Sequence, residues 1–170
     1  MSEHDALGSI PRKILLHIDF SPSSQAALET AVDLALHFHA ELFFVNVIPS
    51  FSSFTSEYVA PQMQFQQEEK ARAEQRLVKV RAALTKRDVK ASYSVEVADD
   101  IAGAIMAVAE REHADLVVIS THGISGWHPL VFGSVAEKVI KLVQCPLLLL
   151  RSAKPESVVT SSSGRSMEWW

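Results

Sequence analysis

The chain has 170 residues and 48% hydrophobic content, which suits one domain that buries roughly two thirds of its unfolded surface. Its Lys and Arg residues number 16 against 20 Asp and Glu, for a formal net charge of -4, so bulk charge gives no attraction to nucleic acid or to an anionic membrane. A lone cysteine, Cys145, and no apolar leader indicate a cytoplasmic protein without disulfides, and no apolar run approaches the ~18 residues of a membrane span.

Apolar runs and helical periodicities alternate along the chain and predict strands alternating with helices. Ser21 can cap the first helix with Pro22 in its first position, and Pro49 is expected to stop the second strand. In chain order we expect a strand over 13–18, a helix to 39, a strand over 41–48, a helix from about 63 to 86, a strand over 91–97, a helix over 101–112, a strand over 115–120, a helix over 134–142 and a strand over 146–150.

This alternation predicts an α/β fold in which a doubly wound, five-stranded parallel sheet is sandwiched by four helices, because parallel strands need crossover connections. Residues 1–12 then form an N-terminal extension, and the Ser-rich segment 152–170 is expected to be a flexible tail. Ligands of such sheets bind beyond the carboxyl ends of the strands. The residues in question are Asp19, Val47, Asp99 and the loop from Ser120 to Ser134.

Three of the six glycines, Gly123, Gly126 and Gly133, fall within that loop. Gly133 and Ser134 stand where the last predicted helix begins, so backbone N–H groups there are available to a phosphate. The spacing by itself also allows a purely structural role, in which the glycines shape a long loop between a strand and a helix.

Several motifs together resemble the universal stress protein family. They are K-I-L-x-x-x-D-F-S ending at Ser21, N-V-I around Val47, D-L-V-V-I before the loop, Gly123 separated by nine residues from Gly133-Ser134, and C-P-L-L-L-L near the end. The resemblance extends over about 13–151. Ser120 stands where nucleotide-binding members of the family have the first glycine of the loop.

The resemblance implies the strand order 3-2-1-4-5, ATP bound with or without Mg²⁺, and a homodimer formed through the last strand, Leu147 to Leu150. Asp19 and the backbone of Val47 would line the adenosine, with Ile119 and Ser120 at the entrance of the loop. The phosphates would lie against Gly123, Gly133, Ser134 and Val135.

Some of these positions have alternative interpretations. Asp19 suits a ribose hydroxyl, an adenine amine or a metal, but Asp-Phe-Ser-Pro is also the sequence of an Asx turn that leads into a helix. Ser120 retains its backbone N–H, although its Cβ can crowd a phosphate. Asp99 and Asp100 can repel a triphosphate, hold Mg²⁺ or, as we expect, cap the helix that starts at Ile101.

We therefore expect an ATP-binding stress or signalling protein that hydrolyses ATP slowly or not at all. Neither a G-x-x-x-x-G-K-[ST] loop nor a G-x-G-x-x-G motif is present, which argues against a motor ATPase and a dehydrogenase. The histidines are not spaced as zinc ligands, and His17 stands alone in a strand. The alternative functions are a nucleotide-independent dimeric adaptor of the same fold and a phosphoacceptor receiver domain.

Overall fold

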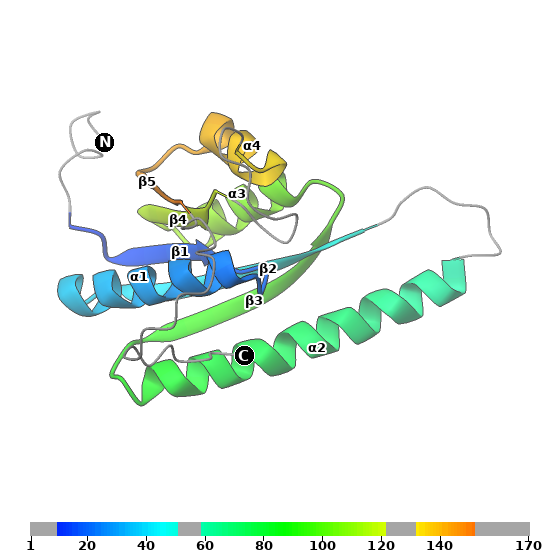
Figure 1. Ribbon diagram of the computed structural model, residues 1–170, viewed down its shortest axis with the longest axis horizontal. Coiled ribbons are helices and arrows are strands. Elements are labelled where there is room, and N and C mark those ends of the chain that lie inside the picture. The colour runs from blue at the N-terminus through cyan, green and yellow to red at the C-terminus, as the bar shows by residue number, and fades with distance from the viewer. Residues whose placement is uncertain (1–9, 51–58, 122–131, 152–170) are drawn as a thin grey trace, which may run out of the picture.

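A computed structural model describes residues 10–50, 59–121 and 132–151. Within these residues the strands form one parallel sheet of five strands in the order β3-β2-β1-β4-β5, so the predicted fold class and strand order are confirmed (Figure 1). The elements are β1 (Lys13–His17), α1 (Pro22–Phe38), β2 (Glu41–Pro49), α2 (Val59–Thr85), β3 (Ala91–Ala98), α3 (Ile101–Arg111), β4 (Leu116–Ser120), α4 (Ser134–Leu142) and β5 (Leu147–Leu150).

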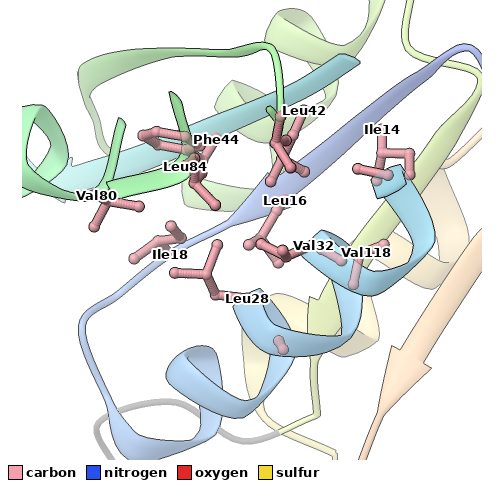
Figure 2. Packing of buried hydrophobic residues seen from close by; sticks show 14 of the residues in the cluster. Ile14, Leu16, Ile18, Leu28, Val32, Leu42, Phe44, Val80, Leu84 and Val118 are labelled. Atoms are coloured by element: carbon pink, nitrogen blue, oxygen red, sulfur yellow. The ribbon is translucent and has the colours of Figure 1, made fainter. Parts of the chain in front are cut away.

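The central strand β1 separates two apolar layers, because successive side chains of a strand point to opposite faces of the sheet. Ile14, Leu16 and Ile18 pack into one cluster with Leu28 and Val32 of α1 and with residues of α2 (Figure 2). Leu15 belongs to the opposite cluster, which α3 and α4 cover. Both faces of the sheet are therefore buried, which explains why the β1 sequence is apolar without alternation.

β2 ends at Pro49, as predicted, but Pro49 is itself the last residue of the strand and pairs with Ala98 of β3. The pairing of β2 with β1 ends at Val45, so near Pro49 the strand has a neighbour on one side only. A proline is tolerated at such an edge, where its missing N–H is not needed. The ladder continues beyond it, since the N–H of Ser50 donates to the carbonyl of Ala98 at 3.0 Å.

The long helix α2 begins at Val59, about four residues before the predicted start. Pro61 is compatible with this earlier start. Proline has no backbone N–H, but the N–H groups in the first turn of a helix have no acceptor within the helix, so no hydrogen bond is lost. In the described residues no helix is both long enough and apolar enough to cross a membrane.

Candidate functional site

A cleft of about 210 Å³ lies beyond the carboxyl ends of β1, β2 and β4. From β1 the chain winds outward through β2 and β3, then crosses back to form β4 and β5 on the other side of β1. The cleft is thus at the point where the winding direction reverses, the usual position of ligands in open α/β sheets.

Seven residues that the sequence singles out lie together in this cleft. They come from four segments that are separate in the sequence and that lie side by side only once the sheet and α4 have folded. These residues are Asp19, Val47, Ile119, Ser120, Gly133, Ser134 and Val135. Gly123, also predicted to lie at the phosphates, is outside the described residues.

Asp19 both lines the cleft and shapes the turn from β1 into α1. Its Oδ1 atom accepts a hydrogen bond from the N–H of Ser21 at 3.0 Å, which is the Asx turn that the sequence allows. Ser21 in turn caps α1, because its side chain accepts from the N–H of Ser24 at 3.1 Å. Turn formation uses one carboxylate oxygen of Asp19, so the binding and structural interpretations are compatible.

Phe20 makes the turn sharp. Its φ of 61° lies in the left-handed region, which a bulky side chain rarely adopts. The ring packs against the cluster of β1, α1 and α2, and the guanidinium carbon of Arg76 lies 4.9 Å from its centroid. These contacts hold the partly buried Phe20 against the cluster and leave Asp19 beside the cleft.

The N-terminus of α4 forms another wall of the cleft. The N–H of Gly133 donates to the carbonyl of Thr121 at 2.8 Å, which joins the start of the helix to the end of β4. Ser134, Val135 and Ala136 follow, and no side chain among the described residues caps their N–H groups. Free amides and the positive end of the helix dipole favour an anion at this wall.

Gly133 occupies the N-cap position with φ -60° and ψ 150°. Any residue can adopt these angles, so the backbone conformation does not require glycine here. What glycine contributes is the absence of a side chain where the helix start meets the cleft. This favours a close approach of a ligand to the backbone.

The cleft carries little charge of its own. Asp19 is the only charged residue among the described residues that line it, and neither lysine nor arginine is in that set. A bound phosphate would therefore interact with amides and hydroxyls, with no cationic side chain from the described lining. This differs from the lysine-containing loops of motor ATPases.

Sequence reasoning missed His17, Pro49, Ile101, Thr121 and Ala136, which also line the cleft. His17 is 7% exposed, and burial lowers the pKa of its imidazole, although Asp19 opposes this shift. One signal was available: His17 precedes Asp19 by two residues, and residues at that spacing share a face of a strand. The apolar residues among these five have no feature in the sequence that distinguishes them from residues of the core.

The expectation that Asp99 or Asp100 caps α3 is only partly right. Asp100 occupies the N-cap position, but its side chain makes no capping hydrogen bond. Its Oδ1 lies 3.7 Å from Nζ of Lys138 on α4, which offers the carboxylate a competing partner. Asp99 accepts a hydrogen bond from Oγ of Ser50, so this carboxylate links the end of β3 to the end of β2.

The family model described as "Universal stress protein family" matches residues 11–151. Universal stress protein MJ0531 of Methanocaldococcus jannaschii is 31% identical over 147 residues, which are 85% of each chain. The structure of universal stress protein UspA from Lactobacillus plantarum has a TM-score of 0.77 at 20% identity and covers 85% of this chain and all of the other.

A second solved structure, the universal stress protein of Archaeoglobus fulgidus in complex with dAMP, has a TM-score of 0.55 at 20% identity. It covers 83% of this chain and 98% of the other. These structures share the fold, while the family model and the M. jannaschii relative extend across the strands and helices that build the cleft. The chain belongs to the universal stress protein family.

Proposed function

We propose that this chain binds an adenine nucleotide, ATP in the first instance, in the cleft beyond β1, β2 and β4. The observation that carries the proposal is that Asp19, Val47 and the start of α4 border one cleft. The neutral nucleoside suits Asp19 and Val47, because a carboxylate accepts hydrogen bonds from hydroxyl and amine groups. The dAMP bound to the Archaeoglobus fulgidus relative supports a ligand of this class.

The phosphates suit the wall formed by Gly133, Ser134 and Val135. The first-turn amides of α4 donate hydrogen bonds, the hydroxyl of Ser134 adds another donor, and the dipole of α4 favours negative charge. Ile119 and Ser120 border this end of the cleft from β4. Gly123 is assigned to the same phosphate end by the family motif alone.

Mg²⁺ fits this proposal as a companion of the phosphates. In the described residues, no three His, Cys, Asp or Glu side chains gather in a way that would hold a metal ion. Mg²⁺ commonly binds through substrate phosphates and water with few protein ligands. Its charge would compensate the phosphates where the described lining offers no cationic side chain.

Slow hydrolysis follows from the same lining. Phosphoryl transfer is accelerated chiefly by positioning and by cationic groups that stabilise the charge of the transition state. Among the described lining residues no lysine or arginine supplies that charge. We therefore infer a protein that holds its nucleotide and reports its presence. Its single cysteine suits the cytoplasm, where thiols are kept reduced.

A homodimer formed through β5 is part of the proposal. The strand lies at one edge of the sheet and consists of Leu147, Leu148, Leu149 and Leu150. An apolar edge strand with free backbone groups favours pairing with another chain. Sedimentation of the protein with and without ATP tests this, and a monomer at all concentrations would contradict it.

The test of nucleotide binding has two steps. The freshly purified protein is denatured and any released nucleotide is identified by chromatography, and the emptied protein is then titrated with ATP in a calorimeter. Released or titratable ATP supports the proposal. A blank in both steps, with and without Mg²⁺, would contradict it and favour the nucleotide-independent adaptor, with Ser120 as the first residue to suspect.

A further inference from the structure

His17 is a polar residue of the cleft that neither the turn nor the family motif accounts for. It ends β1, the central strand, and its side chain is more than nine-tenths buried. It nevertheless lines the cleft, together with Asp19 two residues later. Every buried side-chain nitrogen and oxygen of the described residues has a hydrogen-bond partner, so an imidazole nitrogen that lacks one is a nitrogen that solvent reaches through the cleft.

The ring nitrogens of His17 need hydrogen-bond partners, either water or a ligand. Buried side-chain donors and acceptors are almost always hydrogen-bonded, and each unsatisfied group costs about 1–3 kcal/mol. The described residues that line the cleft with His17 include apolar ones, such as Val47 and Ile101, and polar ones, such as Ser120. A ligand that displaces water from the cleft therefore has to replace the hydrogen bonds that water makes with the imidazole.

The charge state of His17 defines what that ligand group is. Burial lowers the pKa of His17, so the imidazole is neutral near pH 7 and has one N–H donor and one nitrogen acceptor. A ribose hydroxyl or the edge of a purine can both donate and accept. A phosphate at this pH only accepts, so it would leave the acceptor nitrogen unsatisfied.

The charges on the neighbouring elements also favour a nucleoside over a phosphate beside His17. Asp19 is the charged group that faces His17 from its own segment, and it repels a phosphate. The described lining residues from β2, β4, α3 and α4 bring no charged side chain into the cleft, while the free amides of α4 attract phosphate to the wall formed by Gly133, Ser134 and Val135. The nucleoside is thus favoured beside His17.

We propose that His17 is a specificity-determining residue that hydrogen-bonds the nucleoside part of the bound nucleotide from the floor of the cleft. This inference rests on the proposed nucleotide binding and adds to it a direct contact from β1. It predicts that a substantial part of the affinity is independent of the phosphates.

The experiment compares calorimetric titrations of adenosine, AMP and ATP for the wild type and two variants. His17→Leu fills the space but lacks hydrogen-bonding atoms, whereas His17→Gln keeps one donor and one acceptor. The affinity of His17→Leu for all three ligands should fall by about five- to tenfold, the size of one lost hydrogen bond, while His17→Gln stays within about twofold of wild type. Thermal unfolding shows whether both variants are folded.

A direct measurement complements the titrations. The ¹⁵N signals of the His17 imidazole, assigned by their absence from His17→Gln, should shift when adenosine is added to the wild type. A purely structural histidine would show no such shift. The more exposed His37 on α1 is a matched control, and its signals should stay unchanged.

Three results would overturn the inference. If His17→Leu binds all three ligands as the wild type does, His17 is structural. If only AMP and ATP lose affinity, and more so at lower pH, a charged imidazole contacts phosphate. If the wild type binds none of the ligands, the proposed function itself fails, whereas the first two results leave nucleotide binding intact.

Discussion

The carboxylate of Asp19 accepts a hydrogen bond from the N–H of Ser21 at 3.0 Å, and Ser21 is the residue that caps α1. One side chain thus fixes the turn after the central strand and also borders the cleft. Substitutions can separate the effect of Asp19 on ligand binding from its effect on stability. Asparagine keeps the oxygen that accepts the hydrogen bond in the turn but removes the negative charge.

Asp19→Asn should weaken ATP binding with little loss of stability, because its side-chain oxygen still accepts from Ser21. Asp19→Ala should weaken binding and also lower the free energy of unfolding by about 1 kcal/mol, the net value of one hydrogen bond. Calorimetric titration and urea unfolding of both variants measure the two effects. Equal stability of the two variants would show that the turn does not depend on the carboxylate.

Gly133→Val should abolish nucleotide binding, because it places a branched side chain where the start of α4 meets the cleft. Valine can adopt the φ and ψ of Gly133, so the protein should fold. The loss of a good N-cap residue costs it about 1 kcal/mol. Gly133→Ala, with a single methyl group, is the matched control and should retain intermediate affinity. Wild-type affinity in a folded Gly133→Val would contradict the phosphate assignment.

The alternation of strands and helices was predictable from apolar runs and helical periodicities, whereas the strand order came from the resemblance to the family. The location of the cleft was predictable because the family motifs fall at strand ends. Ser21 was predictable as a cap for the same reason, since its neighbour Pro22 has a defined place in a helix. The alternation and the cap depend on local sequence, which is why a single chain was sufficient to predict them.

Other features depend on contacts that sequence spacing does not show. The lysine that lies near Asp100 is on α4, 38 residues further along the chain, so simple N-capping could not be excluded in advance. The continuation of β2 through Pro49 depends on where its pairing with β1 ends. In the sequence, His17 was considered only as a metal ligand and was set aside because no other histidine is near it. Its place in the cleft depends on segments that are far apart in the sequence.

Gly103→Ala should stabilise the protein by about 0.5–1 kcal/mol, because alanine is the better helix former and Gly103 lies inside α3. The added methyl would lie 3.0 Å from Oδ2 of Asp100. That side chain is about half exposed, and its pairing with Lys138 at 3.7 Å is weak, so it can move aside at little cost. A lower melting temperature for Gly103→Ala would show that Asp100 is held in place.

The stability of the protein should fall on acidification because of His17. Its pKa in the folded protein is lowered below the ordinary value of 6.5, chiefly by burial. The unfolded chain therefore binds a proton at His17 before the folded chain does, and its contribution to stability, present above pH 6.5, is lost as the pH falls toward the folded pKa.

Urea unfolding at pH 7.5, 6.5 and 5.5 measures this effect on the wild type and on His17→Gln, which cannot titrate at that position. The wild type should lose up to about 1.4 kcal/mol per pH unit from this residue below its ordinary pKa. The difference in unfolding free energy between the two proteins should change over the same interval. A constant difference would mean that His17 takes up its proton equally in the folded and unfolded states.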